Sequence, residues 1–132
     1  MSMRYLLDTD WTIHYLNGHP DIVRRVDSVR DEGVALSIVS LAELYEGVYY
    51  SRDPRQSESQ LSEFLRGITV LAIDTEACKR FGRERGRLRA AGKLIGDFDL
   101  VIGASALQHN LTVLTNNRRH FGEIADLQVE SL

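Results

Sequence analysis

The stretch Arg4-Tyr5-Leu6-Leu7-Asp8-Thr9-Asp10 passes directly from apolar residues into an acidic turn. Only strand length is available before that turn, so we predict a short buried strand over residues 4–7. Either Thr9 or Asp10 is suited to cap a helix over residues 11–16. The chain therefore begins with a strand, an acidic strand exit and a helix, which is the pattern of an α/β protein.

The same alternation continues along the chain. Short, nearly all-apolar runs indicate strands, and longer runs with apolar residues at helical spacing indicate helices. Strands are predicted over 34–36, 69–73 and 112–114, with a further edge strand over 127–129. Helices are predicted over 21–31, from a cap at Ser37 or Ser40 to about 50, over 56–65, from Asp74 to about 91, and over 98–109. Residues 115–120 are predicted to form a polar loop. These elements predict an α/β sandwich around a parallel sheet of four or five strands.

Composition predicts one globular domain over residues 1–132, with 43% hydrophobic and 27% charged residues. The formal net charge of −3 argues against a protein that holds nucleic acid by bulk electrostatics, but not against an enzyme acting on it. The single cysteine allows no internal disulfide, which fits a reducing compartment. No apolar run approaches the ~20 residues needed to span a bilayer. We therefore expect a cytoplasmic protein with no membrane partner.

Acidic and amide side chains follow several of the predicted strands. Asp8 follows the first, Glu43 lies in the helix after the second, Asp97 and Asp99 flank the start of the helix before the fourth, and Asn117 follows the fourth. The carboxyl ends of parallel strands meet at one edge of a sheet, where sites usually form. Two carboxylates at ~4 Å repel by about 1–4 kcal/mol, so a cation among them is expected.

An all-oxygen ligand set suits Mg²⁺ or Mn²⁺, and such ions promote phosphodiester hydrolysis. Each acid also has a structural interpretation. Asp8 and Asp10 are suited to cap a helix, Asp97 or Asp99 is suited to cap another, and Ser40 and Glu43 have the spacing of a capping box.

Four blocks of the sequence resemble the PIN-domain family, and in particular the VapC-type toxins of VapBC toxin–antitoxin pairs. In chain order they are Leu6-Leu7-Asp8-Thr9-Asp10, Ser40-Leu41-Ala42-Glu43-Leu44-Tyr45-Glu46-Gly47, Ile95-Gly96-Asp97-Phe98-Asp99-Leu100-Val101-Ile102-Gly103-Ala104 and Leu111-Thr112-Val113-Leu114-Thr115-Asn116-Asn117-Arg118-Arg119-His120-Phe121. Each block alone is a weak signal, but all of them in order at family-like spacing make a strong one.

The resemblance implies a three-layer α/β/α sandwich with endoribonuclease activity that depends on Mg²⁺, or on Mn²⁺. It also implies a homodimer and a hetero-oligomer with an inhibitory VapB-type antitoxin. By position, Asp8 and Asp99 are the principal metal ligands, Glu43 is the third acid and Asn117 stands where many PIN nucleases have a fourth. Asp97 is a secondary candidate ligand.

Thr9 and Thr115 are suited to orient the ligands by hydrogen bonds. His14, His19, His109 and His120 show no metal-ligand spacing and are interpreted as surface or structural residues.

Basic residues concentrate between positions 79 and 93, where Arg83 and Arg87 share a helical face. These two, together with Arg118 and Arg119, are candidates for contact with the RNA backbone. A solvated helix face is the alternative interpretation of the same pattern.

Other functions fit parts of the sequence. Asp8-Thr9-Asp10-Trp11-Thr12 fits the D-x-D-x-T motif of haloacid-dehalogenase-like phosphatases, in which Asp8 would be the nucleophile. A catalytically weak regulatory binding module is a second alternative, and an RNA-processing role within the same fold is a third.

Overall fold

The computed structural model describes residues 3–132. Its centre is a five-stranded parallel sheet with strand order β3-β2-β1-β4-β5. The strands are β1 (Tyr5–Leu7), β2 (Val34–Ser37), β3 (Thr69–Leu71), β4 (Thr112–Leu114) and β5 (Gln128–Glu130). The predicted parallel sheet is confirmed, and the edge strand predicted over 127–129 is present with its start shifted by one residue.

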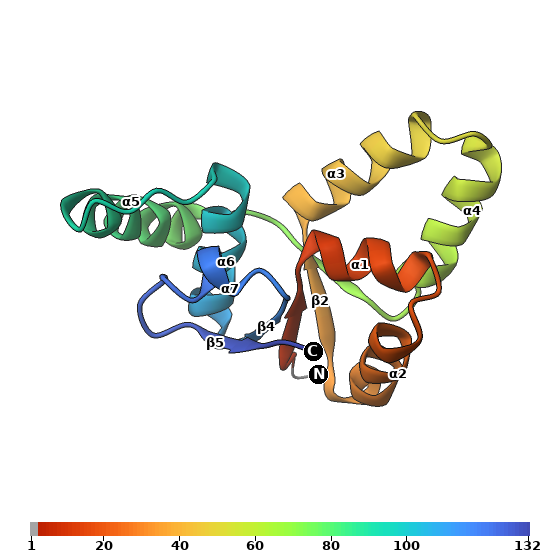
Figure 1. The fold of residues 1–132 in the computed structure, drawn as a ribbon, viewed down its shortest axis with the longest axis horizontal. Coiled ribbons are helices and arrows are strands. Elements are labelled where there is room, and N and C mark those ends of the chain that lie inside the picture. Colours follow the sequence, from red (N-terminus) through yellow and green to blue (C-terminus); the bar gives the residue numbers. More distant parts are fainter. Residues whose placement is uncertain (1–2) are drawn as a thin grey trace.

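Helices follow the strands on both faces of the sheet (Figure 1). They are α1 (Thr9–Leu16), α2 (Pro20–Val29), α3 (Ile38–Tyr49), α4 (Pro54–Leu65), α5 (Thr75–Ala90), α6 (Asp97–His109) and α7 (Arg118–Phe121), with a short 3₁₀ helix η1 (Arg30–Glu32) before β2. The short helix α7 lies in a stretch that we expected to be a polar loop.

Two apolar cores separate the layers, because alternate residues of each strand point to opposite faces of the sheet. On β1, Leu7 packs with the α1–α4 side, whereas Leu6 packs with the α5–α7 side. All three residues of β1 are buried, as expected for a central strand covered on both faces. The three-layer sandwich is therefore confirmed.

The turn before β2 depends on Gly33, whose φ of +94° lies in a region that other residues rarely adopt. Its carbonyl oxygen accepts hydrogen bonds from the backbone N–H groups of Arg4 and Tyr5, at 2.9 and 3.1 Å. This turn aligns β2 with β1, so that Leu6 pairs with Ala35.

Register across the centre of the sheet brings distant parts of the chain together. Leu6 of β1 pairs with Ala35 on one side and with Val113 on the other. As a result, the residues after β1, β2 and β4 leave the sheet at the same edge. Within residues 3–132, no helix is long and apolar enough to cross a membrane.

Candidate active site

Asp8 stands at the exit of the central strand. Its backbone N–H donates to the carbonyl oxygen of Leu114 at 3.1 Å, so the residue is fixed where the β1–β4 ladder ends. The Asp8 side chain is only 4% exposed, and its Oδ2 accepts a 2.6 Å hydrogen bond from Thr115 Oγ1. Asp8 is also the N-cap of α1, but its side chain makes no capping hydrogen bond. The carboxylate is therefore held for some purpose other than helix capping.

Burial raises the pKa of Asp8 from an ordinary 3.8 to about 6. The hydrogen bond from Thr115 opposes this rise, whereas the negative charges of Asp10 and Asp99 add to it. A desolvated carboxylate next to like charges is unstable on its own and is stabilised by a cation.

Glu43 is held by Thr9, the residue that follows Asp8 and begins α1. Thr9 Oγ1 lies 2.8 Å from both Glu43 Oε1 and Ser40 Oγ. A hydroxyl carries one proton and an ionised carboxylate only accepts, so Thr9 donates to Glu43 and accepts from Ser40. Thr9 thus contacts Glu43, and its role in orienting a metal ligand stays a prediction.

The capping-box interpretation of Ser40 and Glu43 is wrong. Helix α3 begins earlier, with Ser37 as N-cap accepting a hydrogen bond from the Val39 N–H at 3.2 Å. Ser40 is instead fully buried inside the helix, where it contacts Thr9. Glu43 is consequently free of a capping role and available to the site.

Asp99 projects from the first turn of α6, where two residues of the β4–β5 connection contact it. Its Oδ2 lies 2.7 Å from His120 Nδ1 and accepts a 3.3 Å hydrogen bond from Asn117 Nδ2. Asn117 is also the N-cap of α7, accepting from the His120 N–H at 3.4 Å. The predicted amide therefore does reach Asp99.

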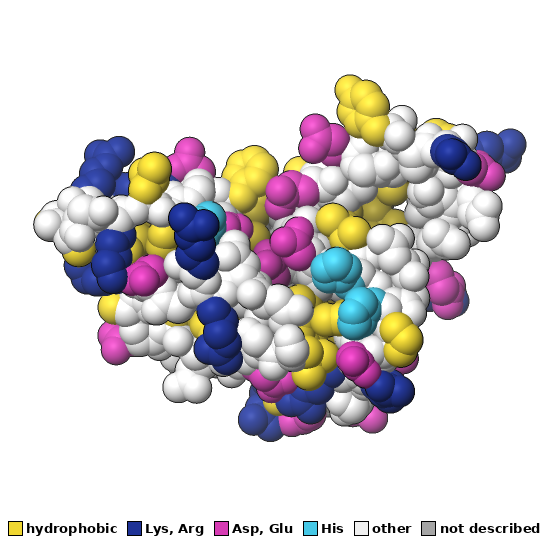
Figure 2. Space-filling view, in the orientation of Figure 1, with side chains coloured by type: hydrophobic (Ala, Val, Ile, Leu, Met, Phe, Trp, Pro, Cys, Tyr) yellow, Lys and Arg dark blue, Asp and Glu magenta, His cyan; other side chains and the backbone are white. Residues whose placement is uncertain are grey.

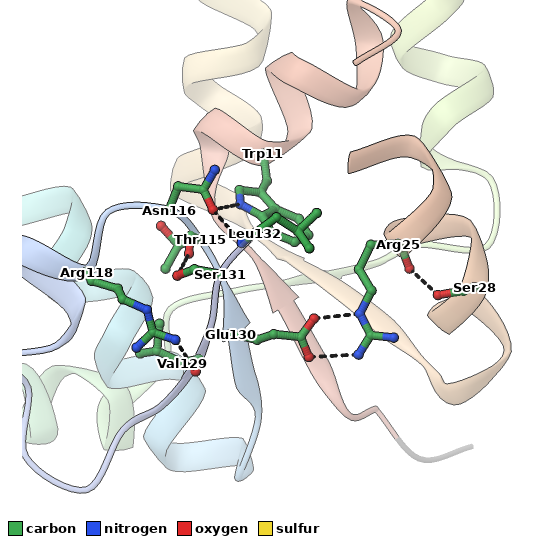
Figure 3. A network of polar contacts seen from close by, with 10 residues as sticks. All are labelled: Trp11, Arg25, Ser28, Thr115, Asn116, Arg118, Val129, Glu130, Ser131 and Leu132. Carbon is green, nitrogen blue, oxygen red and sulfur yellow. Dashed lines mark hydrogen bonds and ion pairs between the residues drawn. The ribbon is translucent and has the colours of Figure 1, made fainter. Parts of the chain in front are cut away.

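The loop after β4 presents consecutive side chains in different directions. Thr115 contacts Asp8 and Asn117 contacts Asp99, while the Asn117 N–H donates to Thr115 Oγ1 at 2.9 Å. Between them, Asn116 Oδ1 accepts hydrogen bonds from the indole N–H of buried Trp11 (3.2 Å) and from the Leu132 N–H (3.0 Å) (Figure 3). These contacts tie the loop to α1 and to the segment after β5.

Asp97 is placed away from the other acids. Its side chain is 82% exposed and pairs with Arg85 Nη2 at 2.5 Å, and Arg85 Nη1 also donates to the Ile95 carbonyl at 2.8 Å. These contacts hold the α5–α6 connection in place. The structure assigns Asp97 a partner on α5, and its secondary metal role stays a prediction.

The four basic candidates occupy different places. Arg83 lines a hollow with Leu107 and Asn110, at the end of α6 opposite to Asp99. Arg87 pairs with Glu84, which lies 2.7 Å away, and donates to the Glu123 carbonyl at 2.6 Å.

Arg118 and Arg119, in contrast, lie on α7 next to His120. Arg118 Nη2 donates to the Val129 carbonyl at 3.3 Å (Figure 3), and Arg119 is exposed. Of the four candidates, only Arg118 and Arg119 thus lie on the helix whose His120 contacts Asp99.

Acidic side chains gather near the middle of one face, where the α1–α3 half of the molecule meets the α6–α7 half (Figure 2). Within residues 3–132, no three acidic, histidine or cysteine side chains already form a metal-ligand set. Asp8 and Asp99 are nevertheless close enough for their charges to interact, and Glu43 is hydrogen-bonded to Thr9, the residue after Asp8. These all-oxygen donors fit a hard divalent cation, which would relieve the burial and repulsion acting on Asp8.

His120 is the site residue that the sequence did not reveal. Its spacing from the acids matches no metal-ligand pattern, and the helix that carries it was expected to be a loop. The only available signal is the spacing Asn117-x-x-His120, which allows Asn117 to cap a helical turn and so turn the imidazole toward Asp99.

This parallel-sheet sandwich with acids at its carboxyl edge defines a class of nuclease domain. A family model described as the PIN domain matches residues 5–127. The chain therefore belongs to the PIN-domain family, and its relatives place it among the VapC proteins.

"Ribonuclease VapC2" of Rickettsia felis is 32% identical over 98% of both chains. "tRNA(fMet)-specific endonuclease VapC" of Shigella flexneri is 30% identical over 97% of both.

Solved structures agree with this placement. The crystal structure of VapBC2 from Rickettsia felis bound to a DNA fragment from their promoter matches with a TM-score of 0.91 and 31% identity, over 98% of this chain and 99% of that one. The structure of DNA-bound VapBC from Salmonella typhimurium matches with a TM-score of 0.90 and 28% identity, over 98% of each chain.

Proposed function

We propose that this protein is the toxin of a type II toxin–antitoxin pair, acting as a Mg²⁺-dependent endoribonuclease that a cognate VapB-type antitoxin inhibits. The observation that carries this proposal is the buried Asp8 carboxyl, with its pKa raised to about 6 next to Asp99, at the carboxyl edge of a PIN-domain sheet. An enzyme acting on cellular RNA would work in the cytoplasm. The relatives called VapC ribonucleases support RNA as the substrate.

Asp8 and Asp99 are proposed to hold the ion, with Glu43 as the third acid and Asn117 as a weak neutral donor. When bound, Mg²⁺ would supply electrostatic stabilisation of the phosphodiester oxygens. Glu43, which is hydrogen-bonded to Thr9, is proposed to accept the proton of the attacking water. Thr115 keeps the Asp8 carboxylate in position through its 2.6 Å hydrogen bond.

The antitoxin is proposed to bind beside the site. An apolar cleft of about 250 Å³ runs between α1, α3 and α4, and its lining includes Leu16, Leu44, Val48 and Leu61, with Glu43 also on its wall. A cleft of this kind accepts the apolar face of an amphipathic helix. The matching solved structures are VapBC assemblies, which supports a hetero-oligomer of this kind, and we propose a toxin homodimer within it.

The phosphatase alternative is not favoured, because the chain is a PIN domain by sequence and by fold. It would also leave Glu43, Thr9 and Ser40 without a role. Asp10 separates the two activities experimentally, since a phosphatase of that type requires it and a PIN nuclease does not.

The test is cleavage of RNA by the purified protein with Mg²⁺ or Mn²⁺, with initiator tRNA among the substrates. We expect Asp8→Ala and Asp99→Ala to lower kcat by at least a hundredfold, and Asp10→Asn to retain activity. Undiminished cleavage after Asp8→Ala or Asp99→Ala would contradict the assignment. A metal titration by calorimetry addresses the binding-module alternative, which predicts that no ion binds.

A further inference from the structure

We infer that His120 is a positioning residue for Asp99, fixing which oxygen of that carboxylate faces the cation. This inference rests on the proposed function, because it concerns the same metal site. It starts from the 2.7 Å contact between His120 Nδ1 and Asp99 Oδ2, which nothing in the motif pattern required.

The short contact between His120 and Asp99 indicates which of the two groups carries the shared hydrogen. Two acceptor atoms do not approach to 2.7 Å, so His120 Nδ1 carries hydrogen and donates it to Asp99 Oδ2. Asn117 Nδ2 lies 3.3 Å from both Asp99 Oδ2 and His120 Nδ1. Because a protonated Nδ1 offers no lone pair, the Asn117 amide also donates to Asp99.

Both donors therefore hold the same oxygen of Asp99. Within residues 3–132, Asp99 Oδ1 accepts no side-chain hydrogen bond, so this oxygen is the one left for a cation. The carboxylate is thus oriented for contact through one oxygen. Hydrogen-bonded partners of metal ligands typically change metal affinity by 10–100-fold when removed.

The short helix α7, which carries the His120 imidazole, is anchored at both of its ends. The next residue, Phe121, is fully buried against the α6 side of the sheet, and Asn117 caps the turn. Removal of the His120 side chain leaves the capping acceptor and the backbone N–H of residue 120 in place. A His120 variant therefore tests the contact with Asp99 more than the fold of α7.

The experiment measures Mn²⁺ affinity by calorimetry on RNA-free protein. We expect His120→Ala to weaken Mn²⁺ binding about tenfold. His120→Asn, whose amide can replace the Nδ1 donor, should recover most of the loss. His109→Ala, at the opposite end of α6, is the matched control and should bind as the wild type does.

A second readout needs neither metal nor activity. In ¹⁵N NMR spectra of the metal-free wild type at pH 8.5, where imidazoles are ordinarily neutral, His120 should be the Nδ1–H tautomer. Equal Mn²⁺ affinity of wild type and His120→Ala, or an Nε2–H tautomer, overturns the inference. If His120→Ala fails to fold, the tautomer decides.

Failure of the proposed function has a different signature. The wild type would then bind no Mn²⁺, or Asp99→Ala would bind it unchanged, whatever the tautomer of His120.

Discussion

At the scale of single residues, the burial of Asp8 has a cost in stability. A carboxyl whose pKa is higher in the folded than in the unfolded protein stabilises the fold when protonated, and that contribution is lost as pH rises. For Asp8 the loss falls between about 4 and 6, because its pKa rises from 3.8 to about 6. The full shift corresponds to about 3 kcal/mol.

Asp8→Asn should therefore stabilise the metal-free protein. The variant removes the charge and keeps an oxygen that can accept from Thr115. We expect its Tm to exceed that of the wild type at pH 7.5, with the difference shrinking toward zero near pH 4. Mg²⁺ should raise the Tm of the wild type only.

Thermal unfolding across this pH range provides the measurement. Asp31→Asn is the matched control, because Asp31 is exposed and is not among the charges that raise the pKa of Asp8. An Asp8→Asn protein that is less stable than the wild type at pH 7.5 would contradict the account.

Whether a site residue could be predicted from the sequence depended on what fixes its position in the fold. Asp8 directly follows the first strand and Glu43 lies in the helix after the second, so their placement near the carboxyl edge of the sheet made them candidates from the sequence. Asp99 was preferred to Asp97 through the family resemblance. The positions of Asp97 and His120 were not predictable, because their roles depend on side-chain partners. Arg85 pairs with Asp97, and the α7 turn directs His120 to Asp99.

At the scale of elements, an ion pair connects the sheet edge to a helix far away in the chain. Arg25 of α2 binds Glu130 of β5 through two hydrogen bonds of 2.5 and 2.8 Å (Figure 3). Arg25 lowers the pKa of Glu130. Stability from this pair is therefore present above the ordinary pKa of 4.5 and is lost as pH falls below it.

Arg25→Gln should lower Tm by roughly 4 °C near neutral pH. This corresponds to about 1 kcal/mol, since both side chains are about one-third exposed and water screens the pair. The difference from wild type should shrink below about pH 4, as Glu130 becomes protonated.

The matched comparison is Arg24→Gln, whose partner Asp21 is on the same helix and largely exposed. Calorimetric unfolding of both variants tests the prediction. An equal effect of the two substitutions would show that the Arg25–Glu130 pair has no special role.

The elements themselves were largely predictable, because apolar periodicity decides them. All five strands and the longer helices appear where expected. Helix α7 was missed because Arg118–Phe121 is too short for any periodicity and depends on the Asn117 cap and on buried Phe121.

At the scale of the whole molecule, the basic residues differ in where they lie relative to the acidic edge of the sheet. Arg119 lies on α7 next to His120. Arg83 lies on α5, beside the end of α6 that is opposite to Asp99. RNA bound at the acidic edge would place its phosphates near α7. The sequence pattern alone makes Arg83 and Arg119 equal candidates for contact with RNA, whereas their separation across the fold distinguishes them.

Arg119→Gln should weaken RNA binding several-fold and reduce the salt dependence of binding by about 0.7 in the slope of log K against log salt, the value for one phosphate on a single strand. Arg83→Gln should change neither. Binding measured at several salt concentrations, in an Asp99→Asn background that prevents cleavage, tests this. Equal effects of the two substitutions would favour a diffuse basic surface.

The pairing of β1 with β4 also sets when the site can exist during protein synthesis. Asp8 leaves the ribosome early, but the groups that hold Asp8 and Asp99 in place, Thr115, Asn117 and His120, are translated more than 100 residues later. A nascent chain that stops before β4 has the β1–β2 ladder but neither the β1–β4 ladder nor the loop that supplies Thr115, Asn117 and His120. Ribosomes translating this message are therefore not exposed to an active nuclease until almost the whole chain has emerged.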